Sequence, residues 1–183
     1  EGVIDVVPDT PRARQKDNPR PFFRFYPLVS KDEDIYKKLL NTAQAMSNEQ
    51  VEVRGVTVTD ELYDLLLFVT HSFIRPITTE LYALKHEDVT VANDPRRLIL
   101  TIKNGKTGYR SANTMPAAVS VYDRICLRSP QRTAGDYLFL NDYANRTTAS
   151  KVVQRQFHEL LDRANIHHDT VTGKKHTLYS LRH

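Results

Sequence analysis

The stretch from Leu62 to Pro76 reads LYDLLLFVTHSFIRP, and it decides how the rest of the chain is interpreted. Its apolar residues recur at the spacing of one helix face, which predicts an amphipathic helix with its apolar side in the core. Thr59 and Asp60 precede the stretch and suit a helix start. Pro76 forces the helix to break, so Arg75 is expected at its C-terminal end.

The segments around this helix predict a mainly helical domain of the α+β class. Apolar residues keep helical spacing over residues 30–46, 116–127 and 147–164. Ser30 and Glu33 suit a capping box, in which each side chain bonds a backbone N–H at the helix start. These segments are predicted to pack their apolar faces around a common core.

A small sheet is predicted between the helices. Residues 98–103 alternate apolar and more polar side chains, the period of a strand, and Asn104-Gly105 is a strong hairpin signal. A β-rich segment at 89–91 precedes this strand, and a return strand is expected from Lys106 to about Thr114. Together they predict a three-stranded antiparallel meander.

Composition sets broad limits on the setting of the protein. The 183 residues suffice for one domain, and 26 Lys and Arg against 22 Asp and Glu give a formal charge of +4. Such a mild excess suits a partner that carries phosphates, although many proteins without one share it. A lone Cys126 cannot form an intrachain disulfide, which favours a reducing, cytoplasmic setting. No apolar stretch approaches the ~20 residues that cross a bilayer, so no membrane partner is expected.

Residues 1–28 are predicted to form a linker, and residues 29–183 one folded domain. Five prolines interrupt any helix in the first segment, and basic residues are frequent there. Arg12, Arg14 and Lys16 are candidates for contact with a phosphate backbone. A solvated tail without a ligand is the open alternative.

Three cations stand out by their positions. Arg75 follows an apolar helix, Lys106 follows a tight hairpin turn, and Arg182 lies between Leu181 and His183 in an apolar context. An arginine is costly to bury unless a carboxylate or phosphate meets its planar fork. Taken singly, each of the three is as well explained by a surface cation or a structural ion pair.

In this order, however, the motifs resemble those of the tyrosine recombinase family, especially phage integrases. The resemblance covers about residue 28 to the last residue. Its pieces are His71-Ser72-Phe73-Ile74-Arg75-Pro76, the run from Glu80 to Val89, Lys106-Thr107-Gly108, the connector Asp136-Tyr137-Leu138-Phe139-Leu140, and Tyr179-Ser180-Leu181-Arg182-His183. Any one motif is weak, but the ordered set is specific. The resemblance implies the family's catalytic-domain fold.

It also implies double-stranded DNA as the substrate and a transesterification that needs neither metal nor nucleotide cofactor. A tyrosine attacks a backbone phosphate to form a 3′-phosphotyrosyl link, and the freed 5′-hydroxyl then attacks a partner strand. Charge gathers on the phosphorane-like oxygens, where preorganised guanidinium groups stabilise it. By resemblance, Arg75 and Arg182 clamp the phosphate and Lys106 donates the proton to the leaving oxygen.

The sequence departs from the family pattern at two site positions. Tyr179 stands where the family usually has a histidine, and a phenol donates a hydrogen bond but is a poor base near neutral pH. His176 is a further, weaker candidate for that role. Thr78 stands where an acidic residue usually supports the first arginine, and the sequence leaves open whether Glu80 replaces it.

The third departure concerns the nucleophile. In the family the attacking tyrosine lies downstream of the second arginine, and none of the nine tyrosines here occupies its motif. We therefore expect this polypeptide to be truncated before the nucleophile, monomeric and unable to cleave DNA. Its full-length parent is expected to be a bacterial, prophage-type integrase that assembles as a tetramer on DNA attachment sites.

Other basic residues are secondary candidates for contact with DNA. Lys103 and Arg110 flank Lys106 on the predicted hairpin, and Lys151 and Arg155 lie on the polar side of the last helix. A charged helix face of this kind is usually only solvated.

Other functions were weighed against the recombinase hypothesis. The run His167-His168-Asp169 lacks the spacing of a zinc site, and no glycine-rich phosphate loop is present. The main alternative is a non-catalytic, DNA-binding or regulatory relative with the same fold. An unrelated helical interaction domain is the second, and it predicts Arg75 and Arg182 on opposite sides of the molecule.

Overall fold

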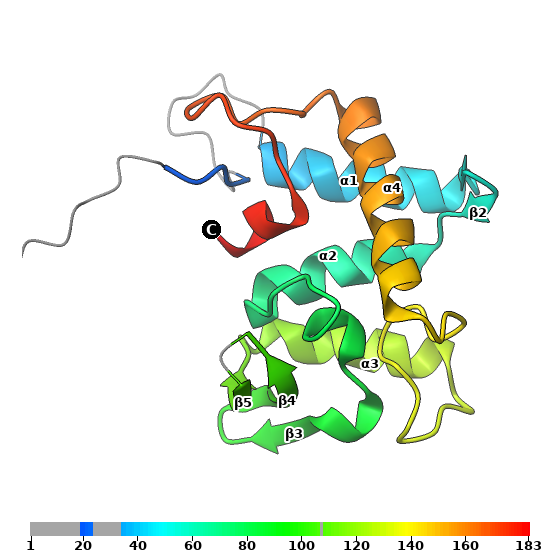
Figure 1. Ribbon diagram of the computed structural model, residues 1–183, viewed down its shortest axis with the longest axis vertical. Helices are drawn as coiled ribbons and strands as arrows, with labels where there is room; N and C mark the ends of the chain where they lie inside the picture. The colour runs from blue at the N-terminus through cyan, green and yellow to red at the C-terminus, as the bar shows by residue number, and fades with distance from the viewer. Residues whose placement is uncertain (1–18, 24–33, 107) are drawn as a thin grey trace, which may run out of the picture.

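Helix α2 (Asp60–Ser72) lies at the centre of the computed structural model, which describes residues 19–23, 34–106 and 108–183. Thr59 caps its start by accepting a hydrogen bond from the Glu61 amide, as predicted. Helices α1 (Ile35–Asn48) and α3 (Ala117–Arg128) and the 3-10 helix η3 (Leu178–Arg182) pack against it (Figure 1). The apolar stretch that predicted a core helix is therefore the helix around which the domain is built.

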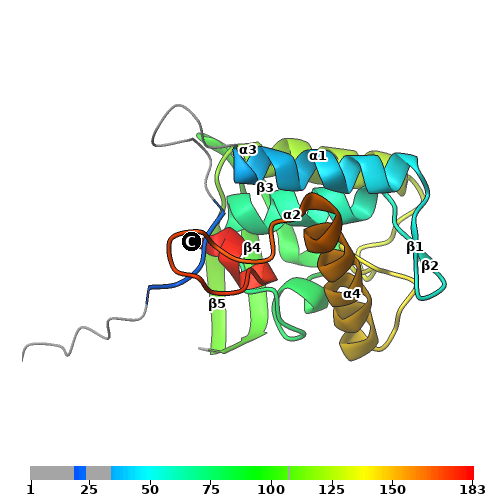
Figure 2. The same cartoon turned by 90° about the horizontal axis from the view of Figure 1, so that it is seen from above.

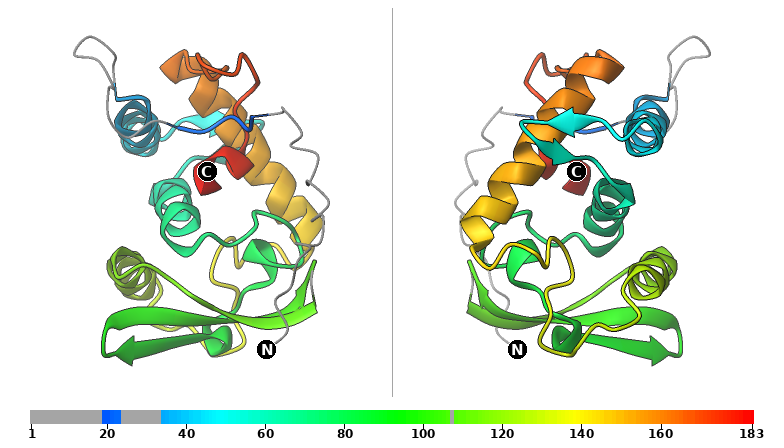
Figure 3. Two further views of the ribbon diagram at one scale, coloured as in Figure 1. Left: turned by 90° about the vertical axis from the view of Figure 1, so that its left-hand side faces the viewer. Right: turned by 90° about the vertical axis from the view of Figure 1, so that its right-hand side faces the viewer.

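Two layers enclose α2. On one side α1 packs against α4 (Arg146–Ala164), and on the other α3 lies against the sheet (Figure 3). The N-cap of α1 is Asp34, and the capping box predicted at Ser30 and Glu33 lies outside the described residues. Helix α4 begins one residue before the predicted Thr147, because Asn145 accepts hydrogen bonds from the first free amides.

The predicted three-stranded antiparallel sheet is present, in the order β3-β4-β5. Its strands are β3 (Val89–Asn93), β4 (Arg96–Gly105) and β5 (Gly108–Asn113). Leu98, Leu100 and Ile102 are buried on one face of β4, and β4 contacts α3. A short hairpin, β1 (Glu52–Val53) with β2 (Val56–Thr57), and two 3-10 turns, η1 (Leu81–Ala83) and η2 (His86–Asp88), complete the elements.

The hairpin turn differs from the prediction. Gly105 pairs with Gly108, so the strands run past Asn104-Gly105 and Lys106 lies in the connection instead of on the return strand. Gly108 has a φ of +84°, a conformation that glycine adopts without strain. The turn thus forms two residues later than the Asn-Gly signal indicates, which moves Lys106 to the tip of the hairpin.

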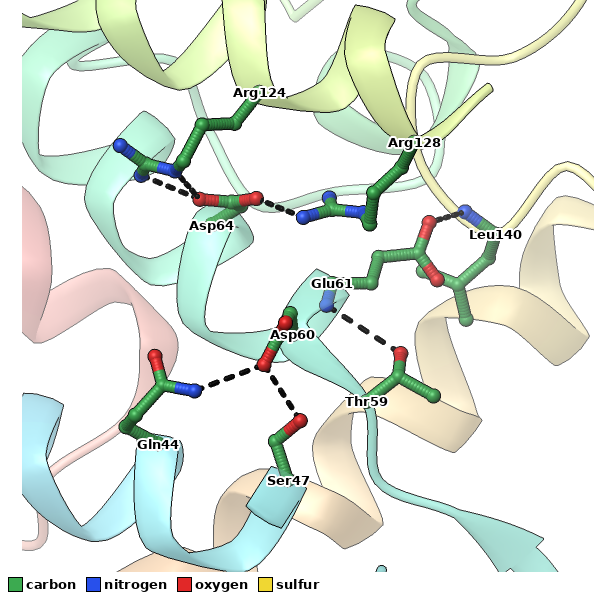
Figure 4. Close-up of polar contacts among 9 residues, drawn as sticks. All are labelled: Gln44, Ser47, Thr59, Asp60, Glu61, Asp64, Arg124, Arg128 and Leu140. Atoms are coloured by element: carbon green, nitrogen blue, oxygen red, sulfur yellow. Dashed lines mark hydrogen bonds and ion pairs between the residues drawn. The ribbon is translucent and has the colours of Figure 1, made fainter. Parts of the chain in front are cut away.

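Polar side chains join the first half of α2 to its neighbours (Figure 4). Asp64 is only 1% exposed and accepts hydrogen bonds from Arg124, at 2.9 Å from its Nε, and from Arg128, both on α3. We call these three residues the Asp64 cluster. Asp60 accepts from Gln44 at 2.9 Å and Ser47 at 2.7 Å on α1. The cluster fixes α3 against α2, which in turn orients the sheet that α3 contacts.

Arg146 ties the connector before α4 to the rest of the fold. Its guanidinium donates to the carbonyl oxygens of Tyr82, Phe139, Leu140 and Tyr143 and lies 3.9 Å from the centroid of the Tyr137 ring. Arginine suits this role because its five N–H groups form a rigid fork. Carbonyl groups of the predicted connector are therefore held by one half-buried cation.

Within the described ranges, no helix is long and apolar enough to cross a membrane.

Candidate functional site

The site begins where α2 ends. Phe73, the C-cap of α2, has a φ of 54°, and this left-handed residue turns the chain away from the helix axis. The Arg75 carbonyl then accepts hydrogen bonds from the amides of Ile77, at 2.8 Å, and Leu81, at 3.2 Å. This tight loop brings Glu80 back beside Arg75, five residues earlier in the chain.

Glu80 gathers the cations around it. Its side chain is fully buried, and its Oε1 accepts from Arg75 Nη1 at 2.7 Å and from the Lys106 amide at 3.2 Å. Its Oε2 accepts from Arg110 Nη2 at 2.8 Å. We call Arg75, Glu80, Lys106 and Arg110 the Glu80 cluster. The carboxylate that the sequence left uncertain therefore does support Arg75, and it also joins Arg75 to the hairpin that carries Lys106.

The electrostatics agree with this geometry. Burial alone raises the pKa of Glu80, but hydrogen bonds from Arg75, the Lys106 amide and Arg110 outweigh it and hold that pKa below its ordinary value. The hydrogen bond to Glu80 raises the pKa of Arg75. Glu80 is thus an anion, and Arg75 remains a cation whose side chain is still 23% exposed. The exposed part of the guanidinium is free to meet a second anion.

The hairpin approaches Glu80 closely because residue 105 is glycine. A Cβ atom there would lie 3.0 Å from Cγ2 of Ile102, 3.1 Å from the Gly108 carbonyl oxygen and 3.2 Å from Oε1 of Glu80. These separations are tighter than ordinary contacts, so a side chain would push the hairpin away from the carboxylate. Glycine at position 105 therefore allows the hairpin to lie close to Glu80, in addition to forming part of the Asn-Gly turn signal.

Helix η3 brings Arg182 to the same end of α2. Its Nε donates to the Phe73 carbonyl at 2.7 Å, two residues before Arg75. Burial and then the positive charge of Arg75 lower the pKa of Arg182, as expected for two cations that share a site. Tyr179 lies one turn earlier on η3, is 38% exposed, and has its ring centroid 5.8 Å from the Arg182 guanidinium carbon.

These residues surround one cleft of about 970 Å³. We call it the η3 cleft, and its lining residues are Arg20, Pro21, Arg75, Lys106, Thr177, Tyr179, Ser180, Arg182 and His183. No Asp or Glu belongs to this lining in the described part of the chain. The structure therefore brings together all four residues predicted to be catalytic and places Arg75 and Arg182 on the same side. Their chemical roles remain predictions.

The secondary DNA-binding candidates lie in different surroundings. Lys103 pairs with Glu87 at 2.7 Å and Asp88 at 2.8 Å, and these carboxylates raise its pKa. Lys151 and Arg155 are exposed and line a separate groove of mixed charge on α4. Lys103 thus already has anionic partners, whereas Lys151 and Arg155 remain accessible to a further ligand.

Arg110 donates to the buried Glu80, and its side chain is 30% exposed. Its contact with DNA remains a prediction. Arg12, Arg14 and Lys16 lie outside the described residues.

The histidines that were weighed as candidates have structural contacts. His176 is buried, with Nδ1 2.8 Å from the Ile166 carbonyl and Nε2 3.2 Å from the Phe22 carbonyl. It therefore faces backbone and does not line the η3 cleft. Asp169 is buried and accepts from the amides of Val171 and Thr172. Among the described residues, no group of three or more His, Cys, Asp or Glu side chains could hold a metal ion.

Sequence reasoning missed two ionisable residues of the cleft lining, Arg20 and His183. His183 directly follows Arg182 in the sequence, so its place beside a predicted site residue could have identified it. Burial, followed by the charges of Arg20 and Arg182, lowers its pKa. Arg20 had only its place in a basic, proline-rich segment as a signal, and that segment gave no reason to select it over its neighbours.

Among solved structures, one described as the crystal structure of XerA recombinase is similar to this chain in fold. The match has a TM-score of 0.51 at 23% sequence identity and covers 82% of this chain and 46% of that chain. The chain thus spans less than half the length of the structure it matches. No family model and no curated protein matches the sequence. At this identity the likeness establishes the fold, and the predicted recombinase catalytic-domain fold is confirmed.

Proposed function

We propose that this chain forms the phosphate-binding part of the active site of a tyrosine recombinase, which cuts and rejoins double-stranded DNA. The observation that carries the proposal is the convergence of Arg75, Lys106 and Arg182 on a cleft whose described lining has no Asp or Glu side chain. Three cations without lining acids favour a phosphate ligand. The fold shared with a recombinase supports the same conclusion.

The chemistry follows from where the cations lie. Arg75 is oriented by Glu80 and Arg182 by the Phe73 carbonyl, so both guanidinium groups are fixed before substrate arrives. Fixed donors stabilise the charge that develops on a phosphorane without reorganising. Lys106, at the hairpin tip, donates the proton to the leaving 5′-oxygen. Tyr179 donates a hydrogen bond to a phosphate oxygen.

The attacking tyrosine belongs to another segment of a longer parent in this proposal. Tyr36 and Tyr82 are buried, and Tyr109 is exposed but outside the cleft lining, so Tyr179 is the only described tyrosine there. The present polypeptide then binds DNA without cleaving it, and the parent acts as a tetramer on its attachment sites. Residues 29–183 are the catalytic domain, and residues 1–28 link it to an upstream domain.

Binding and covalent capture test this proposal separately. Arg75→Ala and Arg182→Ala should each weaken binding of a fluorescein-labelled DNA duplex at least tenfold, with a marked fall in salt dependence. Arg96→Ala is the matched control, because Arg96 is exposed, pairs only with Asp123 among the described residues, and lies outside the cleft lining. Equal effects of all three variants would contradict the proposed cleft.

The second arm uses a nicked suicide substrate, which traps a phosphotyrosyl link. This polypeptide should form no adduct, and the parent with its downstream segment should form one. An adduct with this polypeptide that disappears in Tyr179→Phe would show that Tyr179 is the nucleophile and that the assignment is wrong.

A non-catalytic DNA-binding relative is the second candidate function, and Tyr179 is the observation that favours it. A phenol occupies the position where the family has an imidazole, beside Arg182. In that case the parent should bind DNA through the η3 cleft but leave supercoiled DNA unrelaxed. Relaxation by the parent would exclude this candidate.

A further inference from the structure

Residues 19–23 lie against the chain that leads into η3, although about 150 positions separate the two in sequence (Figure 2). The Pro19 carbonyl accepts from Lys174 Nζ at 2.8 Å, and the Phe22 carbonyl lies 3.2 Å from His176 Nε2. Phe23 is only 3% exposed. This short segment is therefore held to the folded body at both of its ends.

Phe23 provides the apolar part of the attachment. Its ring stacks on His176 with centroids 4.2 Å apart and an interplanar angle of 24°, and it meets Phe157 edge-on at 6.3 Å. Burying an aromatic side chain removes a large apolar surface from water, which stabilises the attachment. The segment thus has enough contact with the core to hold the residues just before it in one place.

Arg20 lies between these attachments and lines the η3 cleft. It is exposed, and no carboxylate of a described residue forms an ion pair with it. Arg75, by contrast, already shares its charge with Glu80. Arg20 therefore adds a full positive charge to the cleft lining from a segment that is far from η3 in sequence.

The cleft is larger than one phosphate requires. A volume of about 970 Å³ is at the upper end of pockets that hold a whole drug-sized molecule. Arg75 and Arg182 lie together at the end of α2, whereas Arg20 comes from a different segment. A nucleic acid strand presents phosphates in series, so cations from separate segments can meet successive ones.

We propose that Arg20 binds a second backbone phosphate of the DNA strand, next to the phosphate held by Arg75 and Arg182. The N-terminal segment is then a wall of the binding site as well as a connection, and Phe23 is the residue that positions it. This inference rests on the proposed function, since it assumes that the η3 cleft takes a DNA strand.

Two probes of different size test the inference on the 183-residue chain. Arg20→Ala should lower affinity for a fluorescein-labelled DNA duplex several-fold and reduce the slope of log K against log salt by about 0.9, the value for one phosphate contact. Its affinity for inorganic phosphate, followed by NMR titration, should change less than twofold. Arg75→Ala should weaken both probes.

A double-mutant cycle tests the role of Phe23. Phe23→Ala, checked for a retained fold by circular dichroism, should reproduce the loss seen in Arg20→Ala, and the two changes together should add little. Fully additive losses, or a correctly folded Phe23→Ala with wild-type duplex affinity, would show that Phe23 does not position Arg20.

Each remaining outcome also decides the question. If Arg20→Ala behaves as the exposed control Arg96→Ala on the duplex while Arg75→Ala is impaired, the inference fails and the proposed function stands. If Arg20→Ala loses inorganic phosphate as strongly as the duplex, Arg20 shares the first phosphate and the second site is wrong. If Arg75→Ala binds both probes normally, the proposed function itself fails.

Discussion

Two buried carboxylates, one on α2 and one just beyond its end, differ in what surrounds them. Asp64 and Glu80 are each about 1% exposed, and each accepts hydrogen bonds from two arginines of neighbouring segments. The Asp64 cluster lies next to further acids, Asp60 and Glu61, on the same helix (Figure 4). The Glu80 cluster borders a cleft that adds more cations and no acid from the described residues.

This difference separates a structural ion pair from a binding site. An arginine that meets a buried carboxylate does not by itself indicate a ligand, because the carboxylate already balances its charge. Cations in excess of the acids among the described residues, facing an open cleft, favour an anionic ligand. Removing each carboxylate should therefore have different consequences, and the following experiments test that difference.

The largest effect on stability is expected for Asp64→Ala. It leaves Arg124 and Arg128 without their acceptor, although their side chains, 43% and 35% exposed, regain some solvation. We expect a loss of about 2–3 kcal/mol in the free energy of unfolding, measured with urea. Phosphate binding should stay unchanged in the folded protein. Weakened phosphate binding would mean that the Asp64 cluster also contributes to the site.

Glu80→Gln should impair both stability and binding. The neutral amide keeps the size of the side chain but loses the charge that orients Arg75 and Arg110, for an expected cost of about 1–2 kcal/mol. Duplex affinity should fall as well, because Arg75 and the Lys106 hairpin lose their common acceptor. A stability loss with unaltered binding would reduce Glu80 to a structural role like that of Asp64.

The pH dependence of the unfolding free energy shows whether the Glu80 anion stabilises the folded state. Its folded pKa lies below the ordinary 4.5, so the folded state favours the anion. The resulting stability is present above pH 4.5 and is lost as the pH falls through the folded pKa. The difference in unfolding free energy between wild type and Glu80→Gln should therefore shrink on acidification. A constant difference down to the acid transition would contradict the lowered pKa.

Gly105→Ala should act on the hairpin. The added Cβ meets Oε1 of Glu80 at 3.2 Å and Cγ2 of Ile102 at 3.0 Å, so the hairpin must shift. We expect a loss of about 1 kcal/mol and a few-fold weaker duplex binding, measured by urea unfolding and anisotropy. Gly135→Ala is the control, because like Gly105 it has no positive φ, and its added Cβ meets only Oγ1 of Thr133 at an ordinary 3.9 Å. A weaker effect of Gly105→Ala than of the control would argue against close packing on Glu80.

The smallest effect should be a gain. Burial, the largest influence, raises the pKa of Glu61, although a hydrogen bond from the Leu140 amide opposes it. Its anion therefore destabilises the folded state at neutral pH, and Glu61→Gln should raise stability by up to about 1 kcal/mol there. The gain should vanish as the pH falls and the wild-type carboxyl becomes protonated. Urea unfolding at neutral and at mildly acidic pH measures the gain in stability and its loss on acidification.

The parts of the fold that depend on nearby residues could be predicted from the sequence. The apolar period of α2 and the alternation along β4 are local, so both elements were found with small errors at their ends. The turn was misplaced because the Asn-Gly signal does not include the pairing of Gly105 with Gly108 or the hydrogen bond from the Lys106 amide to the distant Glu80. Local turn signals carry no information about such contacts.

The site was predicted to a similar extent and for the same reason. Arg75, Lys106 and Arg182 were recognised by the motifs around them. The contact of Arg110 with Glu80 was not predicted, because it depends on the pairing of β4 with β5. Arg20 required knowledge that Phe23 packs on His176, far along the chain. Motifs thus selected residues that the structure places around one cleft, and tertiary contacts decided which of them face one another.

The hydrogen bond from the Lys106 amide to Glu80 makes the exchange of that amide hydrogen a measure of hairpin opening. An amide at the tip of an exposed hairpin ordinarily exchanges its hydrogen with solvent quickly. Here that hydrogen is held by a buried carboxylate, so it can exchange only when the hairpin separates from the end of α2. The exchange rate of one backbone hydrogen therefore measures how often this side of the site opens, with or without DNA present.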